Sequence, residues 1–193
     1  KIAENAKRII DDKQSSTKDY KTTIHEVENE AKIKYDDSQI AAINAALENQ
    51  IFILTGGPGT GKTTIINGIV KSFAKVNKLS LDVNKYKDDA FPVLLAAPTG
   101  RAAKKMSEST GIPAATIHRL LGLNGNDEED GNDIDGQLLI IDEMSMVDTE
   151  LFTKLMKSIP TGMKVILVGD KDQLPSVGPG QVFYDLIRSE VIP

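Results

Sequence analysis

A glycine-rich run at residues 56–64 is the part of the sequence best suited to chemistry. It reads GGPGTGKTT and matches the pattern G-x-x-x-x-G-K-[ST]. A short apolar stretch at residues 51–55 precedes it and predicts a buried strand. Apolar residues at helical spacing follow over residues 64–73. This order of strand, loop and helix predicts a phosphate-binding loop, and the alternative is a glycine-rich turn with a chance lysine.

We expect this loop to bind the phosphates of a nucleotide with its backbone. Glycine reaches backbone angles that are closed to other residues, so the loop can wrap a phosphate with its N–H groups pointing inward. The N-terminus of the following helix adds roughly half a positive charge. Lys62 should reach the β- and γ-phosphates, and the hydroxyl of Thr63 should bind Mg²⁺. The predicted nucleotide-binding residues are Gly57, Pro58, Gly59, Thr60, Gly61, Lys62, Thr63 and Thr64.

Two adjacent acids, Asp142 and Glu143, follow the apolar run Leu-Leu-Ile-Ile, and a second strand is expected over residues 138–142. Successive side chains of a strand point to opposite faces, so the two acids can have different roles. Asp142 is the candidate Mg²⁺ ligand, directly or through water. Glu143 is the candidate general base that polarises the attacking water. The alternative is a strand that simply ends in acids at the solvent.

A polar loop, GDKDQLP at residues 169–175, follows another apolar strand expected at residues 165–168. The side-chain amide of Gln173 can both donate and accept hydrogen bonds. Gln173 is therefore a candidate catalytic residue that senses the γ-phosphate. The alternative is a plain connection between a strand and a helix.

These candidates need a common scaffold, and the sequence alternates strand and helix from residue 51 onward. Strands are expected at 51–55, 93–97, 138–142 and 165–168, and helices near 101–109, 148–158 and 181–188. The alternation predicts an α/β fold with a mostly parallel sheet flanked by helices. Ligands of such sheets bind beyond the carboxyl ends of the strands, which is where the candidate motifs fall.

The first 34 residues are expected to form a helical lead-in, the tail of a preceding domain, and residues 35–193 to form the domain itself. Apolar residues at 2, 6, 9 and 10 suggest one short helix, and those at 24, 27, 31 and 33 suggest a second. A further helix is expected to run through Leu47 from Asp37 or Ser38, either of which is a good N-cap. The chain begins with Lys1 and stops after a helix-like stretch, so we interpret it as a piece of a longer protein.

The composition is that of an ordinary soluble protein. The chain is 40% hydrophobic and 26% charged, has a net charge of −5, and contains no Cys. The lack of Cys excludes disulfides and thiolate metal sites. No apolar run approaches transmembrane length, so we expect a cytoplasmic protein without a membrane partner. The negative net charge argues against a surface wholly wrapped in nucleic acid, but it leaves room for a narrow strand-binding groove.

Over about residues 35–188 the order of segments resembles the RecD-like branch of superfamily 1 DNA helicases. That family has a glutamine before its first motor strand, then GGPGTGK, APTGRAA, T-[IV]-H-R-L-L, IIDE-x-SM and GD-x-x-QLP-x-V-x-x-G. This chain has Gln39 and matching segments at 56–62, 97–103, 116–121, 140–146 and 169–180. Together and in this order the motifs are highly specific, although the phosphate-binding loop alone is not.

The resemblance implies roles for residues outside the phosphate-binding loop. Gln39 resembles the glutamine that reads adenine, because its amide can pair with N6 and N7 of the base. The alternative is a surface glutamine at a helix N-terminus. Two further segments resemble ones that hold the backbone of single-stranded DNA without reading its sequence. Their candidate DNA-binding residues are Thr99, Gly100, Arg101, Thr116 and His118. The alternative for His118 is a half-buried histidine with a structural role.

The resemblance also implies an activity and its partners. It implies a RecA-like motor domain of an ATP-dependent helicase that moves 5′ to 3′ on single-stranded DNA in recombination and repair. ATP and Mg²⁺ are the implied cofactors, and single-stranded DNA and the subunits of a nuclease complex are the implied partners. In this family a second motor domain supplies an arginine to the transition state, so we expect this chain alone to hydrolyse little ATP. Two alternatives stay open: a P-loop ATPase that acts on protein or RNA, and a nucleotide-binding assembly module.

Overall fold

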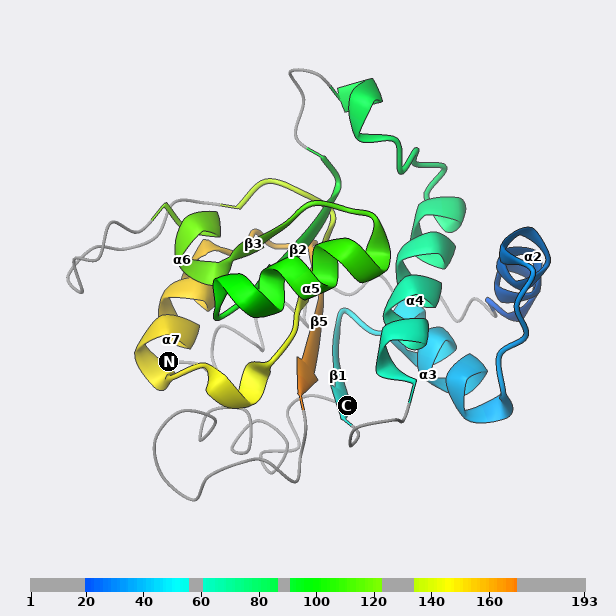
Figure 1. Ribbon diagram of the computed structural model, residues 1–193, viewed down its shortest axis with the longest axis horizontal. Coiled ribbons are helices and arrows are strands. Elements are labelled where there is room, and N and C mark those ends of the chain that lie inside the picture. Colours follow the sequence, from blue (N-terminus) through cyan, green and yellow to red (C-terminus); the bar gives the residue numbers. More distant parts are fainter. Residues whose placement is uncertain (1–19, 56–60, 87–90, 123–133, 170–193) are drawn as a thin grey trace.

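The computed structural model of the chain describes residues 20–55, 61–86, 91–122 and 134–169 (Figure 1). Within these ranges five strands form one sheet, and every pair of neighbouring strands is parallel. In chain order the strands are β1 (Ile51–Thr55), β2 (Val93–Ala97), β3 (Ala114–Thr116), β4 (Leu138–Ile141) and β5 (Lys164–Gly169). Their spatial order is β1-β5-β4-β2-β3. The prediction of a parallel sheet flanked by helices is confirmed.

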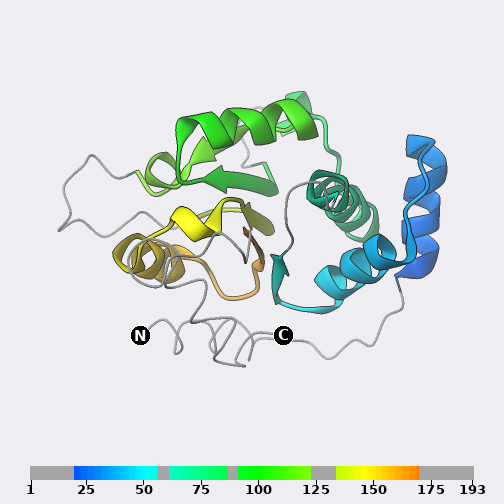
Figure 2. The same cartoon turned by 60° about the horizontal axis from the view of Figure 1, so that its bottom comes forward.

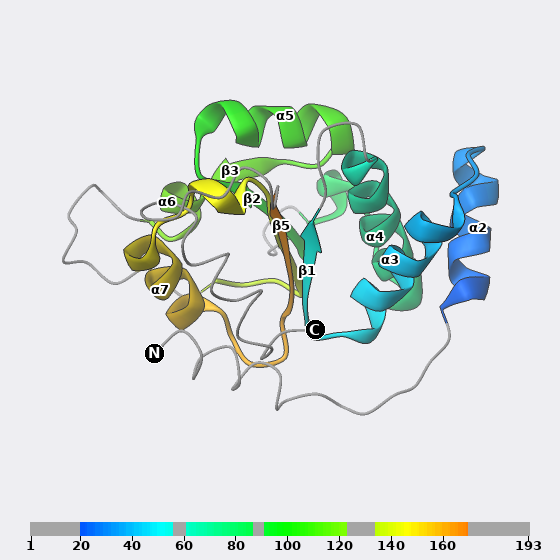
Figure 3. The same cartoon turned by 90° about the horizontal axis from the view of Figure 1, so that it is seen from below.

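Helices lie on both faces of the sheet, as Figure 3 shows for α3 and α4 on one side and α7 on the other. The described helices are α2 (Lys21–Ala31), α3 (Asp37–Glu48), α4 (Lys62–Val76), α5 (Gly100–Thr110), α6 (Ile117–Leu120) and α7 (Thr149–Ser158). Two 3₁₀ turns join them, η1 (Val83–Tyr86) and η2 (Met144–Met146). In the described part of the chain, no helix has both the length and the apolar character needed to cross a membrane.

Two hydrophobic cores hold the layers together, one on each face of the sheet. Helices α3 to α5 pack on the face that receives Leu138 and Ile140 of β4, and α2 joins the same core from outside α3 and α4. The elements α6, η2 and α7 pack on the face that receives Leu139 and Ile141. All four of these side chains are buried, because successive residues of a strand point to opposite faces and both faces are covered.

Helix α3 starts at Asp37, one of the two expected residues, but its N-cap differs by one residue from the expectation. Asp36, and not Asp37 or Ser38, is the N-cap, and its side chain accepts a hydrogen bond from the backbone N–H of Gln39 at 2.8 Å. The backbone N–H of Asp36 in turn donates to Oε1 of Gln39 at 3.0 Å. This reciprocal capping box satisfies two backbone donors at once, which a cap at either later residue would not do.

Helix α2 lies outside α3 and α4 at one end of the molecule (Figures 1 and 2). Its residues Ile24 and Val27 are buried in the same core as α3 and α4. The helix ends at Ala31, followed by Lys32 in a left-handed conformation, so Ile33 lies outside it and is 42% exposed instead of joining the apolar face. The division of the chain after residue 34 stays a prediction.

The strands expected at residues 51–55 and 93–97 have those bounds. Strand β4 ends one residue earlier than expected, and β5 extends one residue further at each end. The sequence analysis did not predict β3 or α6, because three residues and one turn are too short for a periodic signal. The helices expected near residues 2–10 and 181–188 lie outside the described residues.

Candidate functional site

The phosphate-binding loop ends where α4 begins. Gly61 is the N-cap of α4 and has φ 77° and ψ 25°, in the left-handed region that favours glycine. Lys62 is the first helical residue and is half-buried, whereas Thr63 is exposed. Thr64 follows in the same turn, so its backbone N–H and those of its two predecessors are free of intrahelical acceptors. Gly57, Pro58, Gly59 and Thr60 lie outside the described residues.

Gln39 lies against the end of this loop. If Gly61 carried a β-carbon, that atom would be 2.7 Å from Nε2 of Gln39. The residue is half-buried, and its Oε1 accepts from the N–H of Asp36. An amide oxygen has two lone pairs, so this bond leaves the amide able to pair with a base. The structure thus brings the candidate adenine-reading side chain to the candidate phosphate site, although 22 residues separate Gln39 from Gly61 in the sequence.

The acid pair lies directly after β4. The backbone N–H of Asp142 donates to the carbonyl of Ala96 and extends the ladder between β4 and β2 by one bond. Oδ1 of Asp142 accepts from the N–H of Glu143 at 2.8 Å. Glu143 has φ 56° and ψ 41°, a left-handed conformation that is unusual for a residue with a side chain. Both carboxylates are half-buried, so they are accessible at the sheet edge.

The two candidate DNA-binding segments lie side by side. Ala97 at the end of β2 is the register partner of Thr116 at the end of β3. Thr99 is the N-cap of α5 and accepts from the N–H of Ala102, and Thr116 is the N-cap of α6 and accepts from the N–H of Arg119. Both hydroxyls therefore cap helices that begin at the same edge of the sheet.

Gly100, Arg101 and His118 are exposed in these segments. The interpretation of His118 as a half-buried structural histidine is therefore wrong. Arg101 stands in the first turn of α5, at the end of the helix where the dipole disfavours a positive charge. The charge of Arg101 therefore does not stabilise this end of the helix.

All these groups share one edge because every strand runs in the same direction. The ends of β1 and β5 are paired through Thr55 and Gly169, and Ile141 of β4 pairs with Leu167 of β5. Neighbouring strands are about 4.8 Å apart, so the ends of β1 and β4, with β5 between them, are separated by about 10 Å. The phosphate-binding loop and the acid pair thus leave the sheet at the same edge. Gln173, expected nearby, lies outside the described residues.

Hydrogen bonds lower the pKa of two carboxyl groups near the N-terminus of α3. The N–H of Tyr35, and secondarily the side chain of His25, hold the pKa of Glu28 below its ordinary value. The hydroxyl of Ser38, followed by the N–H of Gln39, holds the pKa of Asp36 below its ordinary value. Burial, and secondarily the charge of Glu28, raises the pKa of Tyr35. Glu28, Tyr35 and Asp36 are not themselves residues of the predicted site, whereas Gln39 is.

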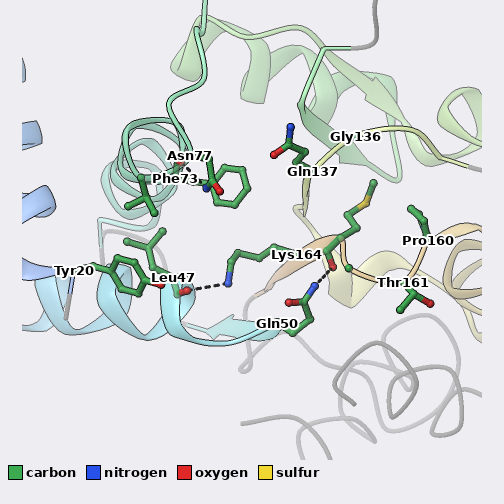
Figure 4. A pocket seen from close by; sticks show the side chains of 13 residues that line it. Tyr20, Leu47, Gln50, Phe73, Asn77, Gly136, Gln137, Pro160, Thr161 and Lys164 are labelled. Carbon is green, nitrogen blue, oxygen red and sulfur yellow. Dashed lines mark hydrogen bonds between the residues drawn. The ribbon is translucent and has the colours of Figure 1, made fainter. Parts of the chain in front are cut away.

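A pocket of about 570 Å³ lies at the opposite edge of the sheet, where the strands begin (Figure 4). Lys164 reaches across it from β5 and donates to the carbonyl oxygens of Ala46 and Leu47, both at 3.0 Å, and of Asn49. Gln50 donates to the carbonyl of Met163 at 2.6 Å. These contacts tie the end of α3 to the start of β5, on the side of the sheet away from the candidate site.

Comparison with known proteins identifies the family. The sequence pattern of the AAA domain family matches residues 39–179, which is most of the chain. The chain belongs to this family. It is 36% identical over 156 residues to the ATP-dependent RecD2 DNA helicase of Deinococcus radiodurans, covering 80% of this chain and 20% of that protein. It is 34% identical over 170 residues to the RecBCD enzyme subunit RecD of Mycobacterium tuberculosis, covering 78% and 28%.

The fold also matches a solved structure. A structure titled "Structural Basis for DNA Unwinding at Forked dsDNA by two coordinating Pif1 helicases" superposes with a TM-score of 0.52 and 22% identity. The match covers 81% of this chain and 38% of that one, and it establishes the RecA-like fold of this AAA domain. The resemblance to RecD-like superfamily 1 helicases is confirmed. The chain spans only 20% to 28% of the length of these two RecD relatives.

Sequence reasoning missed the hydrogen bond between Glu28 and Tyr35, which lies just before the capping box of Asp36 and Gln39. Glu28 and Tyr35 precede the first motif, and nothing in their spacing indicated a link to Gln39. The capping box was visible as an acid followed three residues later by glutamine, at Asp36 and Gln39. The left-handed backbone of Glu143 had no signal in the sequence.

Proposed function

We propose that this AAA domain is the first motor domain of an ATP-driven helicase that moves 5′ to 3′ along single-stranded DNA. The observation that carries the proposal is the shared edge of the sheet. It gathers the start of α4, the acid pair after β4, and the two capped helices after β2 and β3. A nucleotide at one end of this edge and a DNA strand at the other would lie on a single rigid sheet.

Each candidate residue has a proposed role that follows from its chemistry. Lys62 would bind the β- and γ-phosphates, and Gln39 would bind adenine. Glu143 would take a proton from the water whose oxygen attacks the γ-phosphorus, as the bond to the bridging oxygen breaks. Mg²⁺, when bound, would neutralise phosphate charge. Its protein ligands would be Thr63 and Asp142, which supply the oxygen atoms that this ion prefers. Gln173 would sense the γ-phosphate.

The DNA strand would bind at the ends of β2 and β3. Arg101 and His118 would contact phosphates, and the exposed backbone of Gly100 would allow close approach of the strand. Such contacts hold a strand in place without reading its sequence. Closure of a second motor domain on bound ATP would move the strand, and we expect this chain alone to bind nucleotide weakly and hydrolyse little of it. The subunits of a nuclease complex are candidate partners of the full-length protein.

The proposal is tested by ATP hydrolysis of the full-length protein with and without single-stranded DNA. We expect DNA to stimulate hydrolysis, Lys62→Ala to abolish it, and Glu143→Gln to abolish it while ATP binding persists. Glu108→Gln, a matched change of an exposed acid on α5, should leave ATP binding, ATP hydrolysis and its stimulation by DNA unchanged. Stimulation by RNA or by protein but not by DNA would contradict the proposal, and so would normal hydrolysis by Glu143→Gln.

A further inference from the structure

Glu28 is the one charged side chain that the described part of the chain buries, with 8% exposed. Its Oε1 lies 2.7 Å from Nδ1 of His25, and its Oε2 accepts from the N–H of Tyr35 at 2.8 Å. Its backbone carbonyl accepts from the N–H of Ile33 at 3.1 Å. A buried carboxylate is costly unless it is hydrogen-bonded. Glu28 therefore holds both ends of the short connection between α2 and α3.

Tyr35 is anchored a second time, by packing on α4. The ring is 3% exposed, and its hydroxyl oxygen would be 3.1 Å from a β-carbon placed on Gly68. The same β-carbon would be 2.5 Å from Cδ1 of Ile43 in α3, so only glycine permits this approach. Gly68 lies six residues beyond Lys62, about 9 Å along the helix. The connection before α3 is thus held against the helix whose first turn forms the phosphate site.

The anchored connection leads directly to Gln39. Asp36, the residue after Tyr35, is the N-cap of α3, and it exchanges two hydrogen bonds with Gln39. The amide of Gln39 then lies against Gly61, at the end of the phosphate-binding loop. A continuous series of contacts therefore runs from Glu28 through Tyr35 and Asp36 to the base-reading side chain.

We infer that Glu28 is a positioning residue for adenine selectivity, because its bond to the Tyr35 amide places the Gln39 side chain beside the phosphate-binding loop. The inference rests on the proposed function, in which Gln39 reads adenine. Glu28 touches neither base nor phosphate. Two hydrogen bonds to one base tolerate little displacement, so a small shift of α3 should weaken adenine recognition more than phosphate binding.

A matched pair of variants isolates the bond. Glu28→Gln keeps an oxygen at the position that accepts from Tyr35, and Glu28→Asp withdraws both oxygens by one methylene while keeping the charge beside His25. The measurement is kcat/KM for ATP divided by kcat/KM for GTP in the full-length protein, together with the melting temperature. We expect Gln39→Ala to lower this ratio about tenfold. We expect Glu28→Asp to lower it at least about threefold through the KM for ATP, with kcat retained, and Glu28→Gln to keep most of it.

The outcomes separate this inference from the proposed function. A reduced ratio in Gln39→Ala and Glu28→Asp but not in Glu28→Gln supports the inference. A reduced ratio in Gln39→Ala alone, with both Glu28 variants like the wild type, overturns the inference and leaves the proposed function intact. An unchanged ratio in Gln39→Ala overturns the adenine-reading role of Gln39 and the inference with it. A purely structural role of Glu28 would lower the melting temperature without changing the ratio, and that result also overturns the inference.

Discussion

Asp142 accepts a hydrogen bond through Oδ1 from the backbone N–H of Glu143 at 2.8 Å, and Glu143 adopts a left-handed conformation there. The metal-ligand candidate thus braces the backbone of the general-base candidate. Left-handed residues with side chains are strained and persist where the surrounding structure holds them, often at functional positions. The bond uses one carboxylate oxygen, and a carboxylate can accept at both.

Strain at Glu143 should be measurable as stability. Glu143→Gly and Glu143→Ala both remove the carboxylate, but only glycine adopts the left-handed conformation without a steric penalty. We expect the free energy of unfolding of Glu143→Gly to be about 1 kcal/mol higher than that of Glu143→Ala. Both variants should lose ATP hydrolysis. Urea denaturation of the two variants measures the difference. Equal stability would show that the turn is not strained.

The close approach of Gln39 to Gly61 predicts a second effect. Gly61→Ala places a β-carbon 2.7 Å from Nε2 of Gln39 and requires a left-handed alanine with φ near 77°. We expect nucleotide affinity to fall at least about tenfold, because the loop and Gln39 must both move. Titration with a fluorescent ATP analogue measures it. Gly111→Ala is the control: Gly111 is the left-handed C-cap of α5, and no neighbour lies within 4 Å of the added atom, so this variant should bind nucleotide normally.

Lys164, which lies away from the candidate site, should contribute to the stability of the fold. Its ammonium donates to three carbonyl oxygens at the C-terminus of α3, where a positive charge is also favoured by the helix dipole. Lys164→Met keeps most of the side-chain volume and should lower the free energy of unfolding by about 2 kcal/mol. Urea denaturation tests this, with Lys104→Met on the exposed surface of α5 as a control expected within about 0.5 kcal/mol of the wild type.

If Arg101 contacts a DNA phosphate, its removal should change how DNA affinity depends on salt. Loss of one phosphate contact should weaken single-stranded DNA binding by the full-length protein, similarly for all sequences. It should also reduce by about 0.7 the slope of log affinity against log salt concentration. Fluorescence anisotropy at several salt concentrations measures both quantities for Arg101→Ala. Lys105→Ala, an exposed cation one turn further along α5, should leave the slope unchanged. If both variants weakened DNA binding and reduced the slope equally, the effect would come from the overall positive charge of α5 and not from a specific phosphate contact of Arg101.

The lowered pKa of Glu28 predicts how stability depends on pH. Because the folded state favours the ionised carboxylate, the contribution of Glu28 is present above its ordinary pKa of 4.5 and is lost as pH falls through the lower folded value. We expect Glu28→Gln to be less stable than the wild type at pH 7 and to approach it below about pH 4.5. Asp36, whose pKa is also lowered, contributes in both proteins. Urea denaturation as a function of pH checks this, and parallel curves would contradict it.

Particular residues show where sequence reasoning succeeded. The strand before Gly61 and the helix after it were predictable, because both are read from local apolar spacing. The positions of Asp142 and Glu143 at the end of β4 followed from the same kind of signal. The position of Gln39 beside Gly61 could not be predicted in this way. It depends on how α3 packs on α4, where Ile43 closely approaches Gly68.

The sequence by itself determined the chemistry of this protein: which residues are suited to phosphates and divalent ions, and that they follow the strands of a parallel sheet. These features are local, because glycine flexibility and apolar periodicity act over a few residues. Only the tertiary structure decided the strand order that pairs Ala97 with Thr116, and the anchoring of Gln39 through Glu28 and Tyr35. Such contacts join segments through packing and hydrogen bonds between elements, and no periodicity along the chain encodes them.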